Sequence, residues 1–295
     1  PFITLQDRRA DKTKALFLLA LPRSGSTVTY QVICHGLCVQ YLSNLWNLLY
    51  QLPLLGGYIS SFIALRHRSD FRSSHGFVAK LDGPAEGLRF WQWWLGCGLS
   101  DSDCKSCISG RSGSRARYLR SVLNVLTRRA GPFATAYLGH TLAPDHVYNT
   151  FPGAVLIRLR RDPVSNALSL LKAMRNSNRR WFSVLPRECE ALFSASEHER
   201  VAAQVYWLNR RLDGAGCANK MLTVHYEKLC AHPIKELGRI RAWCKINEIN
   251  VDLKFPLPEQ FECNFADLKN DSDAIKIRQA LNDLEEAHGK LESVP

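Results

Sequence analysis

Residues 21–27, "LPRSGST", place an arginine, a glycine and three hydroxyl side chains directly after an apolar run. The run, "ALFLLAL" (15–21), is too short for a helix and is bounded by Pro22, so it predicts a buried strand followed by a helix over 28–39. The first backbone N–H groups of a helix lack internal partners and carry partial positive charge, so this turn can bind an anion such as phosphate. The same residue types also make ordinary helix caps. The residues expected to hold the anion are Arg23, Ser24, Gly25, Ser26 and Thr27.

A second strand-turn-helix pattern lies at 151–173, "FPGAVLIRLRRDPVSNALSLLKA". Arg161 follows the expected strand, and Asp162 and Pro163 suit the cap and first turn of a helix. Ser169 lies eight residues after Arg161, about two helical turns further on. For this pair alone a structural explanation stays open, with Arg161 paired to a carboxylate and Ser169 a tolerated helical serine. Two such patterns on one sheet favour the anion-binding interpretation.

The first turn differs from the Walker A loop, GxxxxGK[ST], in two positions. Aligned on the second glycine, "ALPRSGST" (20–27) has Ala20 in place of the first glycine and Ser26 in place of the lysine. That lysine reaches the terminal phosphates of a nucleoside triphosphate. Its absence argues against ordinary hydrolysis of ATP or GTP.

The elements that must position these residues alternate between strand and helix. Further strands are expected at 132–139, 154–160 and 221–225, and helices at 85–96, 116–129, 163–175, 197–213, 233–245 and 272–290. This alternation predicts an α/β fold, with a central parallel sheet between two helical layers. No convincing linker divides the chain, so residues 1–295 are predicted to form one domain, with 1–13 a flexible N-terminal segment and 97–115 a mobile loop.

Composition limits the partners more than the fold. The net charge is +12, from 39 Lys and Arg against 27 Asp and Glu, which favours anionic partners without choosing among small molecules, nucleic acid or an acidic membrane. The ten cysteines include one CxxC pair (104–107) without a second pair, so reduced thiols and a cytoplasmic protein are expected rather than a metal site. Residues 44–65 are long enough to span a bilayer but contain Pro53 and two glycines; a lid, an acceptor wall or a peripheral membrane contact is favoured over a span.

Taken in order, these motifs resemble those of sulfotransferases that use 3′-phosphoadenosine 5′-phosphosulfate (PAPS), closest to bacterial and carbohydrate types. "LPRSGST" is similar to the family's 5′-phosphosulfate loop, and Arg161 with Ser169 matches its 3′-phosphate motif. "VHYEKLCAHP" (224–233) is similar to a later motif, which implies a place for Tyr226 near the adenine. The resemblance implies a P-loop-like fold, PAPS as donor, adenosine 3′,5′-bisphosphate (PAP) as product, and no metal. The C-terminal RKGxxG segment of cytosolic members is absent, and Val28 replaces their adenine-packing Trp, which leaves the purine contacts open, with Phe265 as one candidate.

The resemblance also implies a catalytic base and an acceptor pocket. His140, in "YLGHTLAPDHV" (137–147), occupies the slot of the family's catalytic histidine and is our expected base, with Arg23 stabilising charge on the bridging oxygen. Its rivals are His146, His75 and Glu86. "GPAEG" (83–87) resembles a bacterial segment near the acceptor, so a small-molecule, sugar or lipid acceptor is expected near Glu86 and Trp91, although Trp91 also suits a core.

Two other classes of function remain as alternatives. A P-loop-related nucleotide or sugar kinase would need a lysine after the loop glycine and a magnesium-binding aspartate, and neither is in place. A nucleic-acid-binding protein is supported only by the net charge, because the chain carries no zinc-finger or RNA-recognition signature.

Overall fold

The protein is built on one parallel β-sheet. The structure is a computed structural model that describes residues 12–64, 66–72, 78, 80–104, 113–262, 268 and 270–291. Its strands are β1 (Ala15–Ala20), β2 (Gln40–Tyr41), β3 (Phe133–Thr135), β4 (Val155–Arg160) and β5 (Met221–His225), all parallel, in the order β2-β3-β1-β4-β5. The predicted α/β class with a central parallel sheet is confirmed.

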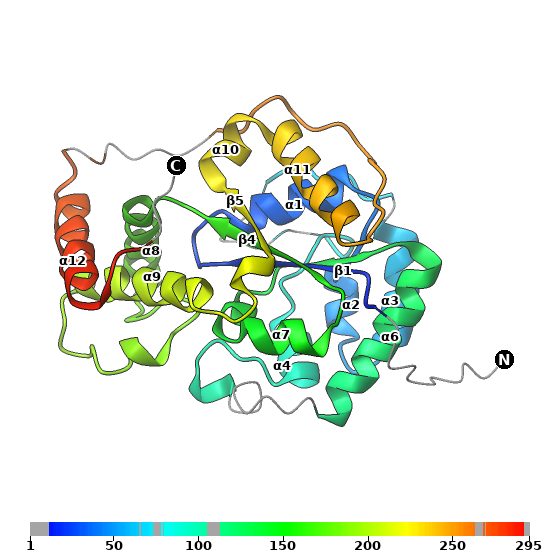
Figure 1. Ribbon diagram of the computed structural model, residues 1–295, viewed down its shortest axis with the longest axis horizontal. Coiled ribbons are helices and arrows are strands. Elements are labelled where there is room, and N and C mark those ends of the chain that lie inside the picture. The colour runs from blue at the N-terminus through cyan, green and yellow to red at the C-terminus, as the bar shows by residue number, and fades with distance from the viewer. Residues whose placement is uncertain are drawn as a thin grey trace.

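Helices cover both faces of the sheet, as Figure 1 shows. One face carries α1 (Ser26–Gly36), α10 (Tyr226–Ala231) and α11 (Pro233–Ile246), and the other carries α4 (Leu88–Leu95) and α7 (Pro144–Thr150). Beside β2 lie α2 (Asn44–Leu48), α3 (Pro53–Ala64) and α6 (Ser114–Ala130). The opposite end is formed by α8 (Pro163–Ser177), α9 (Glu197–Asp213) and α12 (Ser272–His288). The short 3-10 helices are η1 (Ser102–Cys104), η2 (Leu138–Leu142), η3 (Arg187–Cys189) and η4 (Ala218–Lys220).

The central strands are buried along their whole length, which explains why β1 reads as a continuous apolar run. Strand β4 is also fully buried but carries Arg158 and Arg160. Asp213 forms ion pairs with both guanidinium groups, and the side chain and backbone of Asn209 accept hydrogen bonds from Arg158. One buried carboxylate therefore compensates part of the charge of both guanidinium groups.

Side-chain caps begin several helices where the sequence predicts them. The Asp162 carboxylate accepts a hydrogen bond from the Ser165 backbone N–H (2.7 Å), and Pro163 occupies the first turn of α8. Ser196 and Glu199 form a reciprocal capping box on α9. The Asp162 cap and Pro163 make α8 start immediately after β4, which places Arg161 in the intervening turn.

Several details differ from the predictions. The strand expected at 132–139 ends at Thr135, and the chain turns into η2. Strand β2 and helix α10 were not predicted, and residues 44–64 form two helices separated by a turn. Within the described residues no helix is long and apolar enough to cross a membrane. The predictions for residues 1–11, His75, Phe265, Cys107 and the 105–112 part of the expected loop lie outside the described residues.

Candidate active site

A cavity of 610 Å³ lies where the chain leaves the carboxyl ends of β1 and β4. In parallel α/β sheets ligands bind at this edge. The cavity brings together both predicted anion-binding segments and the later motif. The predicted residues that line it are Arg23, Gly25, Ser26, Thr27, Arg161, Ser169, Tyr226 and Glu86.

The loop after β1 is held in an unusual backbone conformation. Arg23 and Gly25 both have positive φ angles, +62° and +93°. The Ser24 hydroxyl donates to the Leu21 carbonyl (2.7 Å), and the Thr29 hydroxyl donates to the Gly25 carbonyl (3.0 Å). Ser24 is buried and does not line the cavity, so its side chain supports the turn rather than facing a ligand.

Gly25 packs directly against the ring of Tyr226. A Cβ atom at Gly25 would lie 2.2 Å from Cδ2 of Tyr226, well inside van der Waals contact, and the positive φ adds strain for any L side chain. Only glycine therefore suits this position.

We expect Gly25→Val to lower the melting temperature by several degrees and to abolish ligand binding, because Tyr226 and the loop cannot both keep their places. Thermal unfolding of the purified variant, with and without PAP, measures both effects. A Gly25→Val protein that binds PAP normally would show that the loop does not depend on this contact.

Direct contacts join the two anion-binding segments. Arg161 Nη1 donates to the Arg23 carbonyl (2.8 Å), and Arg23 Nε donates to Ser169 Oγ (3.4 Å). The Arg161 guanidinium also lies over the Tyr226 ring, 4.8 Å from its centroid. The segments therefore form one site rather than two independent ones.

The backbone around Arg161 is fixed from two sides. The Asp162 N–H donates to Glu227 Oε1 (3.0 Å), which ties the start of α8 to α10. Asn166 Nδ2 donates to the Pro22 carbonyl (2.8 Å), which ties α8 to the loop after β1. Sequence reasoning noted Glu227 only as part of a motif; the structure shows its positioning contact.

The cavity is arranged to attract negative charge. Burial and the adjacent charge of Arg161 lower the pKa of Arg23 below its ordinary value. Two neighbouring guanidinium groups repel each other, and an anion between them relieves that repulsion. Arg179, which the prediction did not include, supplies a third guanidinium to the same cavity.

Most of the remaining residues that line the cavity are apolar. Sequence reasoning did not assign these residues, because they come from loops and helix ends scattered along the chain. Two of these residues, like Arg23, have a positive φ although they are not glycine. The φ angle is +64° at Ser183 and +57° at Phe71. Such strained positions gather at functional sites. The further lining residues include Phe71, Leu99, Leu138, Phe182, Ser183, Phe261 and Glu262.

His140 does not reach this cavity. Its side chain is 0% exposed and packs against the rings of Phe17, Trp91 and Tyr137, with centroid distances of 5.3, 4.5 and 5.1 Å. Burial lowers the His140 pKa to about 3, and neither ring nitrogen has a hydrogen-bond partner. The chain turns into η2 and directs this ring into the core, so the structure does not place His140 at the cavity, and its role as the base stays a prediction.

Trp91 belongs to the same buried cluster. It is 0% exposed, contacts Phe90 and His140, and does not line the cavity. Of the two residues expected near the acceptor, only Glu86 borders the cavity. The rival base His146 lines a separate hollow with Asp145 and Arg210.

Glu86 borders the cavity and has a raised pKa. It lines the cavity, and burial raises the pKa of its carboxyl to about 7. Gly87 follows with a φ of +75° and directly precedes α4, which sets the turn that presents Glu86. A carboxyl with a pKa near neutrality in a cavity has the acid-base properties of a catalytic base. The "GPAEG" segment was the sequence signal for it.

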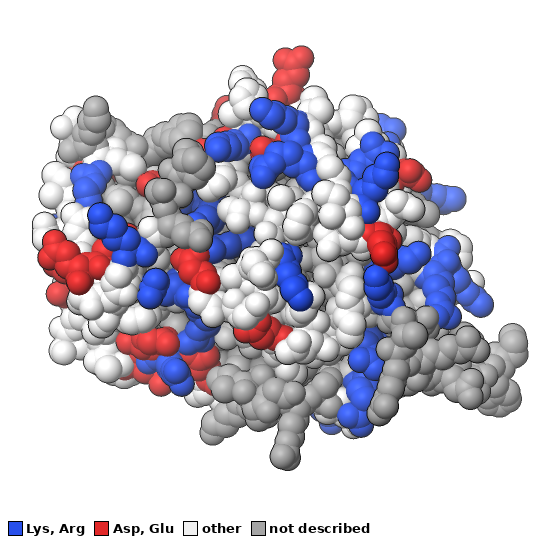
Figure 2. Space-filling view, in the orientation of Figure 1, with Lys and Arg blue, Asp and Glu red and all other residues white. Residues whose placement is uncertain are grey.

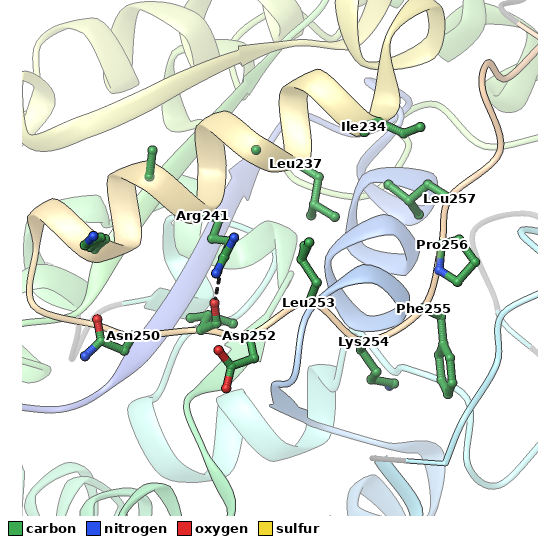
Figure 3. A pocket seen from close by; sticks show the side chains of 14 residues that line it. Ile234, Leu237, Arg241, Asn250, Asp252, Leu253, Lys254, Phe255, Pro256 and Leu257 are labelled. Carbon is green, nitrogen blue, oxygen red and sulfur yellow. Dashed lines mark hydrogen bonds between the residues drawn. The ribbon is translucent and has the colours of Figure 1, made fainter.

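Two further observations concern sites elsewhere. A hollow of 840 Å³ separates α11 from the extended segment 250–257, where Arg241 donates to the Val251 carbonyl (Figure 3). None of the predicted site residues borders it. Among the residues that the structure describes, no three His, Cys, Asp or Glu side chains gather in a way that could hold a metal ion.

The protein has a P-loop-like α/β fold in which the loop after β1 and the start of α8 border one cavity. The model of the sulfotransferase family matches residues 15–249, and the chain belongs to that family. Among solved structures it is similar to sulfotransferase STF9 from Mycobacterium avium, with 16% identity over 97% of this chain and 72% of that one, at a TM-score of 0.47. It is also similar to sulfotransferase STF1 from Mycobacterium tuberculosis, with 15% identity over 93% and 72%, at a TM-score of 0.45. No curated protein sequence matches significantly.

Proposed function

We propose that this protein transfers a sulfuryl group from PAPS to a hydroxyl or amine of a small-molecule, sugar or lipid acceptor. The observation that carries the proposal is the direct contact between the two anion-binding segments in one cavity, through Arg161, Arg23 and Ser169. Family membership supports the reaction class. A donor with a phosphosulfate at one end and a phosphate at the other suits a site with two linked cationic centres.

In this proposal the loop after β1 binds the 5′-phosphosulfate through backbone N–H groups, the Ser26 and Thr27 hydroxyls and Arg23. Arg161 and Ser169 bind the 3′-phosphate, and Tyr226 holds Arg161 in place beneath the purine side of the site. The lining residues fit such a polyanion, because three guanidinium groups border the cavity. Arg23 is suited to meet the charge that builds on the leaving phosphate oxygen.

Glu86 is the proposed general base. It would take the proton of the acceptor hydroxyl or amine as that atom bonds to sulfur, while the bond between sulfur and the 5′-phosphate oxygen breaks and PAP leaves. The raised pKa keeps the carboxylate basic enough for this step near neutral pH. The apolar side chains of Leu99, Leu138 and Phe182 suit the non-reacting part of an acceptor.

Titration with PAP tests the donor site directly. We expect PAP without magnesium to raise the melting temperature by several degrees at saturating concentration. A shift seen only with ATP and magnesium would favour a kinase. Binding only to oligonucleotides, with strong salt dependence, would favour a nucleic-acid-binding protein.

The rate should follow the ionisation of Glu86. A general base acts in its ionised form, so we expect kcat to rise with pH and to level off above about pH 7, the pKa of this carboxyl. The measurement is a pH-rate profile at saturating donor. Below that pKa, kcat should change roughly tenfold per pH unit, as one ionisation requires. A kcat that stays constant from about pH 5 to 8 would remove Glu86 from the mechanism.

Stability gives an independent check of the same pKa. Folding raises the Glu86 pKa above its ordinary value of 4.5, so the folded state favours the protonated carboxyl. Its contribution to stability is complete below about pH 4.5 and is lost as the pH rises to about 7. Glu86→Gln should therefore raise the melting temperature at pH 8 relative to wild type more than at pH 5.

A further inference from the structure

The large apolar side chains of helix α3 face solvent, and its small residues face the protein interior. The exposed fractions are 54% for Leu52, directly before the helix, 51% for Leu55, 51% for Tyr58 and 61% for Phe62. Soluble proteins rarely leave such residues together on one surface without a partner. We call these four residues the α3 ridge.

Spacing and packing make the ridge continuous. Its members follow one another at intervals of three, three and four residues, which places them on one side of a helix. The Tyr58 and Phe62 rings contact each other edge to face, with centroids 5.1 Å apart. Leu48, the last residue of the preceding helix α2, is 66% exposed.

The buried face of α3 is made of small residues, which fixes the ridge outward. A Cβ atom at Gly56 would lie 2.4 Å from Cδ1 of Trp46, and one at Gly57 would lie 2.3 Å from Cδ1 of Leu126. Ser60 and Ala64 continue this face and are also buried. The helix lies so close to its neighbours that rotation could not bring the ridge inward without clashes.

Charge around the ridge has one dominant sign. Residues 44–64 contain no charged side chain, and the exposed residues Arg66, Arg68 and Arg72 follow them, with Asp70 as the only acid in 66–72. Figure 2 shows further Lys and Arg side chains on the right-hand part of the face in view, over α6 and α11. An exposed apolar ridge followed in sequence by exposed arginines suits a surface that is apolar inside and anionic outside.

We infer that the α3 ridge docks the protein on an anionic lipid bilayer. Leu52, Leu55, Tyr58 and Phe62 insert at the boundary between headgroups and acyl chains, and the arginines that follow contact lipid phosphates. An uncharged, exposed apolar helix face favours a bilayer over a protein partner, because a fluid surface needs neither a matching groove nor ion pairs to set orientation. The inference is independent of the proposed reaction.

Vesicle cosedimentation tests the docking. The probes are vesicles of phosphatidylcholine alone and of phosphatidylcholine mixed with phosphatidylglycerol, at several salt concentrations. We expect binding to the anionic vesicles that weakens as salt rises. Replacing both exposed rings (Tyr58→Ser with Phe62→Ser) should weaken this binding at least about tenfold, because most of the inserted aromatic area is lost. Arg66→Ala should weaken binding to the anionic vesicles and leave binding to vesicles of phosphatidylcholine unchanged.

The matched control is Ile246→Ser, which removes a side chain that is 72% exposed on α11 and should leave vesicle binding unchanged. All variants should keep the wild-type melting shift with PAP, so a failed donor site and a failed docking surface are told apart. Equal vesicle binding by wild type and the double variant would overturn the inference. So would a wild-type dimer, measured by light scattering, that the double variant converts to monomer, because a second copy would then cover the ridge.

Discussion

Glu86→Gln should reduce kcat by about 100-fold to 10,000-fold while leaving the affinity for PAP close to that of wild type. The substitution keeps the shape of the side chain and its place in the cavity but removes the atom that accepts a proton. PAP should bind normally because the donor contacts come from the loop after β1 and from α8. Single-turnover rates with labelled donor, together with calorimetric titration of PAP, measure the two quantities separately.

The control for this experiment is His140→Phe. The His140 ring is surrounded by aromatic side chains and makes no hydrogen bond, so phenylalanine should fit its place with little loss of stability and with turnover retained. If His140→Phe folds, binds PAP and has no turnover, while Glu86→Gln remains active, then His140 is the base and must reach the cavity by a rearrangement.

Arg161→Ala is expected to weaken PAP binding by at least about 30-fold. Removing a partly buried charged donor costs about 2–5 kcal/mol when its partner is an anion. The variant also loses the hydrogen bond to the Arg23 carbonyl and the contact with the Tyr226 ring, so the first loop loses support. Calorimetry with PAP provides the measurement, and thermal unfolding without ligand checks that the protein folds.

Arg180→Ala serves as the matched control for charge. Arg180 is exposed, lies near the Phe193 ring and does not border the cavity, so its loss changes net charge equally without touching the site. PAP affinity should stay within about threefold of wild type at moderate salt, since exposed charges are screened. Equal losses for both variants would mean that the overall field, and not a specific contact, determines PAP binding.

Much of the fold could be predicted because the signals were local. The helix at 197–213 and the strand at 221–225 match α9 and β5 at both ends, since a capping box and a short apolar strand mark their limits. Strand β2 has only two residues, Gln40 and Tyr41, and its pairing with β3 depends on contacts distant in sequence. No periodic pattern can reveal a strand of that length.

The candidate site also contains residues that could be predicted from the sequence and residues that could not. The residues of both anion-binding segments could be named from the sequence because their spacing to a strand end determines where they lie. His140 was predicted as the base from its place after an expected strand. The burial of its ring could not be predicted, because it depends on where the chain turns after Thr135. Arg179 was missed because it lies beyond α8, and only the three-dimensional path of the chain brings it to the cavity.

The conformation of Arg23 has a consequence for how this loop can evolve. A residue with a side chain at φ +62° sits in a region that glycine or asparagine occupies more readily, at a cost of about 1 kcal/mol. Substitutions that increase the free energy of unfolding of the ligand-free protein would therefore replace this arginine. Its retention requires selection for the function of its guanidinium group. The apoprotein is therefore less stable than the same backbone would allow, and Arg23 accounts for part of that deficit.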